Sequence, residues 1–308
     1  LSNTTDLSAD NKTANCYIVS TAGNYKFKAI REDNGVTIDV TDVEVLWESF
    51  GSNVAPNEGD LVNGVAYKDG YIHFTATAKK GNAVIAAKKN DKIEWSWHIW
   101  MTDAPNDQEY APGTFFLDRN LGATSAVKAD GVKTFGLLYQ RGRKDPFMGY
   151  VDLSTEPEPT RAASTGTWTY EQNKADNGMD YTVDKPMTFM TSPTNVTNYV
   201  SSDYIIHWLE GEVKSVYDPC PYGYRVPNKD SWGSYDSTSI KLAEGFYEDS
   251  GVIKMGWGLY EVDVWYPQAG QLKSDLTTHK TESLYWTSTV ASNGSLGGYE
   301  ASDFLWGK

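Results

Sequence analysis

The sequence of 308 residues holds little that could bind a transition metal or cross a membrane. It has only four histidines, none of them in a His-x-x-x-His pair, and no Asp-rich loop of the EF-hand type. Scattered carboxylates could still bind calcium through loop oxygens, so calcium stays open as a ligand. No apolar run reaches the ~18 residues of a membrane-spanning helix, and we expect no transmembrane segment.

The signatures of common enzymes are also missing. No Gly-x-Ser-x-Gly elbow occurs, and Glu261 stands where a dinucleotide-binding loop would need a third glycine after Gly256 and Gly258. Cys220 lies between two prolines, with no charged partner in sequence to activate its thiol. Any two of the 41 acidic residues could meet as a glycosidase pair, but no pair stands out.

Positive charge is scarce, since 27 Lys and Arg stand against 41 Asp and Glu and give a net charge of -14. A surface this acidic repels phosphate backbones and anionic lipid head groups, which argues against nucleic acid as a partner. The chain begins at Leu1, without a methionine or a signal peptide, so we read it as a mature or trimmed chain. Its length suits two domains.

Aromatic residues are abundant at 13%, and Trp and Tyr together outnumber Phe. Their apolar faces and polar atoms suit sugar-binding surfaces as well as protein cores. Many lie in the last third of the sequence, where neighbouring Gly, Asp and Ser favour exposed loops. The residues that we expect to bind a ligand are Trp232, Tyr235, Trp257, Tyr260 and Asp263. The alternative is that most of these aromatic residues fill a core, as we expect of Trp286.

Short strands dominate the first third of the sequence. Residues 1–15 are polar and predict a flexible N-terminal tail. Residues 16–103 contain about seven β-rich runs separated by turns, which is typical of an immunoglobulin-like sandwich. Asp-Gly at 69–70 and Asn-Asp at 90–91 favour tight hairpin turns between neighbouring runs.

The clearest of these runs covers residues 93–102, where apolar and polar side chains alternate. This period of two predicts a half-buried antiparallel strand. The expected buried face comprises Ile93, Trp95, Trp97, Ile99 and Met101, and the opposite face comprises Glu94, Ser96, His98 and Thr102.

The pattern changes at residues 103–107, and the remainder predicts a loop-rich α+β domain. Its strongest helix signal covers residues 134–144, with Thr134 as the N-cap and three basic residues near the end, where cations favour the helix dipole. The Asp-Pro step at 145–146 would end this helix.

Cys16 and Cys220 are the only cysteines, and they lie far apart in sequence. If they pair, the disulfide joins the two halves of the chain and indicates an oxidising compartment. If they do not pair, both are small buried hydrophobic residues. Their spacing leaves both alternatives open.

Two sets of short strings stand out along the sequence. The first set is residues 14–19 (ANCYIV), 23–27 (GNYKF), 45–48 (VLWE), 81–86 (GNAVIA) and 95–100 (WSWHIW). The second set is residues 118–123 (DRNLGA), 136–147 (GLLYQRGRKDPF), 218–227 (DPCPYGYRVP) and 285–289 (YWTST). The first set resembles strands of fimbrillin-related surface proteins of anaerobic gut and oral Gram-negative bacteria. The second set resembles a FISUMP-type (major paralogous) domain, including its central Cys-Pro-x-Gly-x-x-x-Pro motif.

The resemblance implies an N-terminal immunoglobulin-like sandwich over residues 16–110 and a C-type-lectin-like domain with long loops over residues 111–308. It also implies a secreted, outer-membrane-associated protein at the cell surface, exported by a signal outside this chain. Such a protein would act in adhesion as a fimbrial or pilus subunit at or near the tip. It would bind other subunits by strand addition, and a glycan or protein ligand on host or neighbouring cells.

One departure from the FISUMP pattern concerns the end of the sequence. Such domains usually continue to a closing strand that carries a further cysteine, and no third cysteine occurs here. The usual local partner of Cys220 is therefore in doubt, which strengthens the case for pairing with Cys16 if the two domains pack closely, and leaves both alternatives open.

Three function hypotheses follow from the resemblance. Adhesion without enzymatic activity comes first, and a structural or assembly module with no sugar site comes second. An enzyme on a formylglycine-generating-like fold comes third, because that chemistry needs a close pair of reactive cysteines, and two cysteines far apart in sequence, one of them outside the lectin-like domain, do not supply that pattern.

Overall fold

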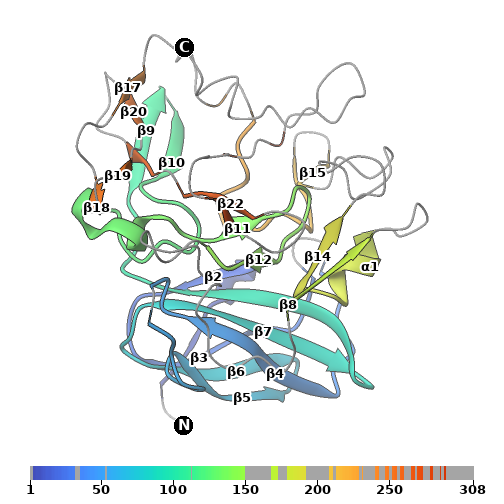
Figure 1. Cartoon of the computed structure of the whole chain (residues 1–308). Coiled ribbons are helices and arrows are strands. Elements are labelled where there is room, and N and C mark those ends of the chain that lie inside the picture. Colours follow the sequence, from blue (N-terminus) through green and yellow to red (C-terminus); the bar gives the residue numbers. More distant parts are fainter. Residues whose placement is uncertain are drawn as a thin grey trace.

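The computed structural model describes most of the chain up to residue 149 and separate pieces of the rest. β-Strands prevail among the described residues, and helices are few (Figure 1). No helix in this described part is both long and apolar enough to cross a membrane. The described residues are 3–31, 35–52, 54–111, 113–149, 168–172, 179–191, 208–210, 213–228, 231, 240–242, 247–249, 252–254, 257–259, 265–267, 269–272, 278–279, 285 and 288.

Two four-stranded sheets form the lower half of the molecule as drawn in Figure 1. The first has the order β1-β3-β6-β5, and the second has the order β2-β8-β7-β4. β1 pairs with β3 and β2 with β8 in parallel, while the other neighbouring strands of these two sheets are antiparallel. The strands are β1 Thr4–Asp6, β2 Cys16–Val19, β3 Gly23–Lys28, β4 Asp42–Ser49, β5 Val62–Lys68, β6 Tyr71–Ala76, β7 Gly81–Lys89 and β8 Lys92–Met101.

Both predicted hairpin turns are confirmed. Asp69 and Gly70, with φ of 51° and 81°, connect β5 to β6. Asn90 and Asp91, with φ of 50° and 66°, connect β7 to β8. Asn, Asp and Gly tolerate these left-handed conformations best, which is why the turns could be read from the sequence.

The N-terminal segment, which we expected to be a flexible tail, contains structure. Its strand β1 pairs with β3, and the short 3₁₀ helix η1 spans Ala9–Asn11. Leu7, the residue after β1, donates its backbone N–H to Lys26 O at 2.8 Å and packs against the core. The strand β1 is too short to show a hydrophobic period. Its hydrogen bonds come from β3, a partner distant in sequence, so the local pattern could not predict it.

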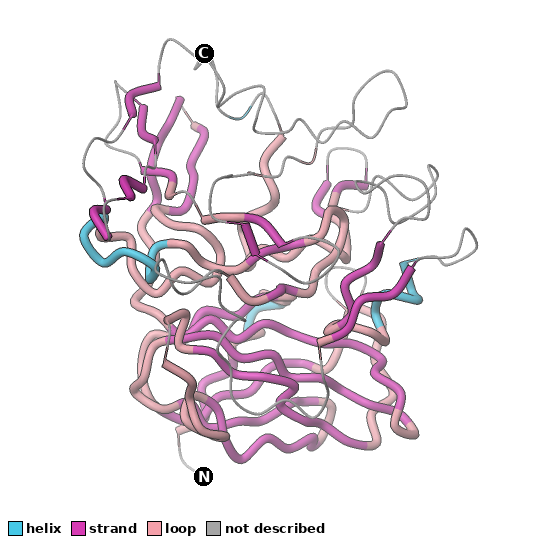
Figure 2. The backbone as a smooth tube through the Cα atoms, viewed as in Figure 1, coloured by secondary structure: helices cyan, strands magenta, loops and turns pink. Residues whose placement is uncertain are grey.

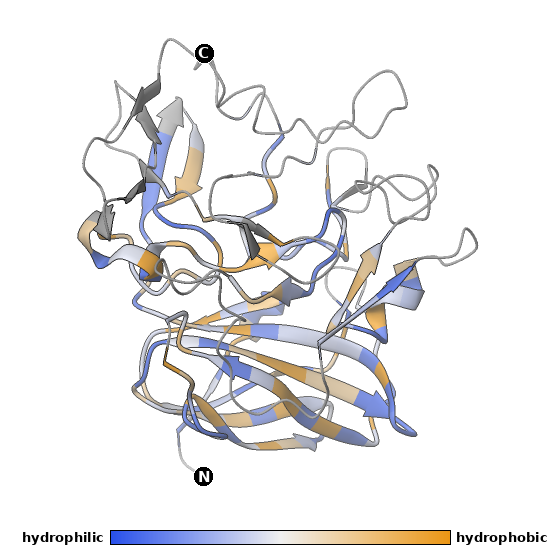
Figure 3. Ribbon diagram, viewed as in Figure 1, coloured by the Kyte–Doolittle hydropathy of each residue, from blue (hydrophilic) through white to orange (hydrophobic). Residues whose placement is uncertain are grey.

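The two sheets enclose one aromatic core. Phe27 of β3 is fully buried, and its ring centroid lies 5.1 Å from that of Trp97 of β8. Buried residues alternate with more exposed ones along β3 and β6, and both hydrophobic and hydrophilic residues occur along the strands of this sandwich (Figure 3). The predicted inner face of β8 is therefore confirmed for its central residues, which are Trp95, Trp97, Ile99 and Met101.

The opposite face of β8 is also buried, so the prediction of a half-buried strand is wrong. Ser96, His98 and Trp100 are at most 2% exposed. Residues from the second part of the chain cover them, and Trp100 Nε1 donates to Ala123 O at 2.9 Å. The polar side chains of this face bind protein groups where we expected water.

The second part of the chain lies above the sandwich and consists mainly of loops and short strands (Figure 2). Its strands pair as β9–β10, β11–β12, β13–β14, β15–β16, β17-β20-β21, β18–β19 and β22–β23. The elements are β9 Asp107–Ala111, β10 Thr114–Leu117, η2 Lys128–Thr134, β11 Leu138–Tyr139, β12 Pro146–Phe147, β13 Thr169–Gln172, α1 Met179–Val183, β14 Thr188–Thr191, β15 Leu209–Glu210, β16 Val213–Lys214, β17 Ile240–Leu242, β18 Tyr247–Asp249, β19 Val252–Lys254, β20 Trp257–Leu259, β21 Trp265–Tyr266, β22 Gln271–Leu272 and β23 Thr278–His279.

The helix predicted over residues 134–144 is absent from this described segment, and β11 lies there instead. Gly136 and Gly142 have φ of 75° and 78°, which interrupt any right-handed helix. Arg143 and Lys144, expected at a solvated helix end, are 1% and 3% exposed. Their cationic groups bind buried oxygens.

The passage from the sandwich to the second part lies between β8 and β9. The boundary that we expected between residues 110 and 111 falls inside the hairpin of β9 and β10, which spans residues 107–117. Residues 102–106 connect the two parts.

Candidate functional site

The most densely connected polar residues lie between the outer face of sheet β2-β8-β7-β4 and the second part of the chain. We call this contact the joint. Lys144 Nζ donates to Ser96 O at 3.0 Å, to Ser96 Oγ at 2.6 Å and to Asp145 Oδ1 at 2.6 Å. Ser96 Oγ donates to the same carboxylate oxygen at 2.5 Å. Lys144 Nζ also lies 4.5 Å from the centre of the Trp95 ring.

A serine hydroxyl within hydrogen-bond distance of a buried lysine has the chemistry of an activated nucleophile. Burial lowers the pKa of Lys144, while the adjacent Asp145 carboxylate opposes that shift. Ser96, Lys144 and Asp145 are only 1%, 3% and 4% exposed, however, so a substrate has no access to the hydroxyl. These three residues therefore join the two parts of the chain and do not form a catalytic site.

A second polar contact of the joint centres on His98. Its Nε2 lies 2.9 Å from Asn82 Oδ1, and Asn82 Nδ2 donates to Gly122 O at 2.9 Å. Burial lowers the pKa of His98 to about 3, so the imidazole is neutral at physiological pH. Asn82 thereby connects β7, β8 and the loop around residue 122.

A third contact connects the start of β2 to the Cys-Pro segment, residues 218–227. Asn15 Nδ2 donates to the carbonyl oxygens of Val216 and Asp218, both at 2.8 Å. Asn15 Oδ1 accepts from Trp95 Nε1 at 2.9 Å. One buried amide therefore fixes this segment to a core tryptophan of the sandwich.

Asp218 organises the Cys-Pro segment itself. Its carboxylate is fully buried and accepts from the backbone N–H groups of Cys220 and Val226, both at 2.8 Å. Lys214 Nζ lies 3.2 Å from Asp218 Oδ1 and donates to the carbonyl oxygens of Cys220 and Tyr224. The segment is thus held by one carboxylate and one ammonium group.

We expect Asp218→Ala to lower the free energy of unfolding by about 2 to 3 kcal/mol, because two buried N–H groups lose a charged acceptor. Asp218→Asn retains one acceptor oxygen and should cost less. Chemical denaturation of both variants measures the difference. A free energy for Asp218→Ala equal to that of the wild type would contradict the role assigned to this carboxylate.

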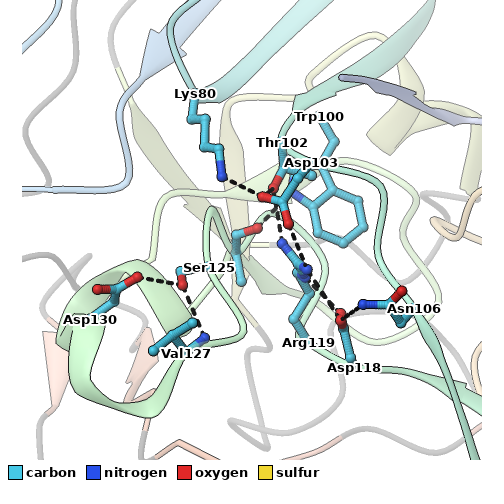
Figure 4. Close-up of polar contacts among 11 residues, drawn as sticks. Lys80, Trp100, Thr102, Asp103, Asn106, Asp118, Arg119, Ser125, Val127 and Asp130 are labelled. Atoms are coloured by element: carbon cyan, nitrogen blue, oxygen red, sulfur yellow. Dashed lines mark hydrogen bonds and ion pairs between the residues drawn. The ribbon is translucent and has the colours of Figure 1, made fainter. Parts of the chain in front are cut away.

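A fourth group of polar residues lies near the surface, where the sandwich meets the β9–β10 hairpin (Figure 4). Arg119 donates from Nε to Asp118 Oδ1 at 2.7 Å and from an Nη atom to Asp103 Oδ2 at 3.1 Å. Lys80 pairs with the same Asp103. The Arg119 guanidinium and the Lys80 ammonium hold the pKa of Asp103 well below its usual range, against an opposing effect of burial.

This group does not offer a ready ligand site. The Arg119 side chain is 3% exposed, and two carboxylates already occupy its donors. Within the described residues, no three His, Cys, Asp or Glu side chains are grouped so that they could hold a metal ion.

Most of the ligand-binding residues expected from the sequence fall outside the described part. Trp257 begins strand β20, whose backbone pairs with β17 and β21, but its side chain is not described. The residues wholly outside the described part are Trp232, Tyr235, Tyr260 and Asp263. Their role in binding stays a prediction.

The two cysteines do come together. Cys16 begins β2 and forms an isolated parallel bridge with Pro221, the residue after Cys220. Both cysteines are buried.

Sequence reasoning missed the joint, although a signal for it was present. Ser96, Lys144, Asp145 and Asp218 all lie within the strings that resemble the two families. The resemblance indicates which residues are shared with the two families, but it does not indicate which of them contact one another. Comparison of the chain with protein-family models, with curated proteins and with solved structures finds no match.

Proposed function

We propose that this protein is a non-enzymatic adhesive subunit of a bacterial surface fimbria, at or near its tip. The sandwich, which we call the mount, holds the second part of the chain in place. The loop-rich second part binds a ligand on host or neighbouring cells, with a glycan as the leading candidate. Calcium is the candidate cofactor. The proposal rests on the resemblance of the strings described above.

The structural observation that supports this proposal, which itself rests on the resemblance, is the buried joint. Lys144, Asn82 and Asn15 fix the second part to one sheet of the sandwich by hydrogen bonds that exclude water. A second part fixed in this way keeps its loops in one orientation relative to the mount, which lowers the entropic cost of ordering on binding.

The strand order supports an immunoglobulin-like sandwich. In the sheet β2-β8-β7-β4, the edge strand β2 pairs in parallel with β8, and β8, β7 and β4 follow the order of one sheet of an immunoglobulin-like sandwich. In the other sheet, β3-β6-β5 follows the order of the opposing sheet, with β1 added at its edge. We assign the second part to the C-type-lectin-like class on the resemblance alone.

Assembly with other subunits would use the open edges of these sheets. β5 ends the first sheet, and Asn63, Ala66 and Tyr67 are exposed along it. An extended segment of a neighbouring subunit could add there by main-chain hydrogen bonds.

One observation favours the structural or assembly alternative. The strings that resemble a FISUMP-type domain supply Arg119, Lys144 and Asp218, and all three bind other protein groups. The resemblance therefore covers residues that build the fold, and lectin-like folds need not bind sugar. An enzyme on a formylglycine-generating-like fold is third, because both cysteines are buried and burial raises the pKa of the Cys220 thiol well above its usual value, which disfavours a reactive thiolate.

The test measures binding of the full chain to a glycan array and to host and bacterial cells, with calcium and with a chelator. We expect Trp257→Ala or Trp232→Ala to raise the protein concentration needed for half-maximal binding about tenfold or more, as for aromatic residues at the centre of an interface. Tyr67→Ala, on the sandwich edge, is the matched control and should bind as the wild type does.

Absence of any bound glycan or cell at high protein concentration would overturn the adhesive proposal and favour the structural module. Binding to cells without any glycan would retain adhesion and assign a protein ligand. An equal loss of binding in Tyr67→Ala would indicate that the binding surface lies on the sandwich.

A further inference from the structure

The two cysteines of the chain face each other across the joint, one in the sandwich and one in the second part. Cys16 is the first residue of β2, which faces the second part of the chain (Figure 1). Cys220 lies in the Cys-Pro segment that Asn15 and Asp218 hold in place. The parallel bridge between Cys16 and Pro221 places the two backbones side by side.

This pairing sets the separation of the two cysteines. Paired strands lie about 4.8 Å apart, and Cys220 is one Cα–Cα step of about 3.8 Å from Pro221. The Cα atoms of Cys16 and Cys220 are therefore about 6 Å apart, within the range of about 4.4 to 6.8 Å found across disulfides.

The surroundings of the two sulfur atoms also coincide. Cys16 is 1% exposed and Cys220 is 7% exposed. Each thiol lies within electrostatic reach of the buried Tyr139 hydroxyl, and the two lie within reach of each other. Both thiols are therefore buried near the Tyr139 hydroxyl, although most of the chain lies between them in sequence.

We propose that Cys16 and Cys220 form a disulfide that covalently joins the first sandwich strand to the second part of the chain. The two thiols lose two protons and two electrons, and one Sγ–Sγ bond forms. A small disulfide such as oxidised glutathione accepts the electrons through a mixed disulfide and leaves as two thiols. This inference does not depend on the adhesive function.

The bond forms while the chain folds and not afterwards. A thiolate is the attacking species in disulfide exchange, and burial raises the pKa of the Cys220 thiol well above its usual value. In the folded, reduced protein both thiols are also shielded from the oxidant. Oxidation therefore precedes closure of the joint.

The test is oxidative refolding of the full chain in reduced and oxidised glutathione, followed by alkylation under denaturing, non-reducing conditions. Trypsin then releases residues 13–26 and 215–225, each with one cysteine. We expect these two peptides to be recovered as one linked species, and the intact mass to lie about 2 Da below that of the reduced chain.

A second measurement is thermal unfolding with and without reductant. The oxidised wild type should melt about 5 °C or more above its reduced form, because the bond restricts the unfolded chain over a long loop. The matched control is the double variant Cys16→Ala with Cys220→Ala, whose melting temperature should not respond to reductant.

Alkyl groups on both peptides, or glutathione attached to either cysteine in the refolded monomer, would overturn the proposal. So would a wild-type melting temperature that reductant leaves unchanged.

Discussion

Asp145→Asn should lower the free energy of unfolding by about 3 to 5 kcal/mol. The substitution leaves the Lys144 ammonium without a carboxylate in a site where water cannot replace it. Lys144 is 3% exposed, and its remaining contacts are two oxygens of Ser96 and the Trp95 ring. Chemical denaturation monitored by tryptophan fluorescence measures the loss.

The double variant Lys144→Met with Asp145→Asn separates the cost of an unpaired charge from the cost of altered packing. Replacing both members of a buried pair is often far less costly than removing one, so the double variant should be more stable than Asp145→Asn alone. Asp39→Asn is the matched surface control, because Asp39 pairs with Lys89 while both side chains are well exposed. We expect no measurable change there. Equal losses for Asp145→Asn and the double variant would contradict the electrostatic role of the joint.

The second large effect is a loss of stability in acid that depends on His98. Burial lowers its folded-state pKa from the usual 6.5 of histidine to about 3. Below pH ~6.5 the unfolded chain binds a proton at this residue and the folded chain does not, so stability falls as pH falls. The expected slope is about 1.4 kcal/mol for each pH unit until the folded imidazole titrates.

Denaturation curves between about pH 7 and pH 4 test this slope, with a predicted contribution from His98 of about 3 kcal/mol at the acid end. His98→Gln removes the titrating group, so its stability should depend less on pH than that of the wild type. His73→Gln, on strand β6 of the opposite sheet, is the matched control and should keep the wild-type dependence. A profile for His98→Gln parallel to that of the wild type would show that other groups cause the acid loss.

The sequence predicted those parts of the fold that depend on neighbouring residues. The turns at 69–70 and 90–91 follow from residues that tolerate positive φ, and the inner face of β8 follows from its period of two. Neither signal needs knowledge of distant contacts. The sandwich strands and the two hairpin turns could therefore be predicted from the local sequence.

The errors share a physical cause, which is contact with residues distant in the chain. Ser96 and His98 looked like residues facing water, because a local pattern cannot reveal a covering segment that comes later in the sequence. Lys144 looked like a cation at a helix end, but its charge is satisfied by Asp145 and by a strand that precedes it by many residues. A buried polar residue and an exposed one look the same in a sequence.

The ligand-binding prediction is a different case. It rested on the composition of loops in the last third, and the structure leaves four of its five residues outside the described part. The binding experiments proposed above test Trp232 among those four, and Trp257 of strand β20.

The parallel strand β2 has a consequence for the order of folding. It is made early in synthesis, yet it pairs with β8 at the end of the sandwich and then with Pro221 far beyond. Contacts between residues so distant in sequence carry a large loop-closure cost and slow the search for the native state. During synthesis, β2 must therefore stay unpaired until β8 has left the ribosome, and its outer edge stays open until the Cys-Pro segment follows. This interval is when the chain is most exposed to wrong pairing with another copy of itself.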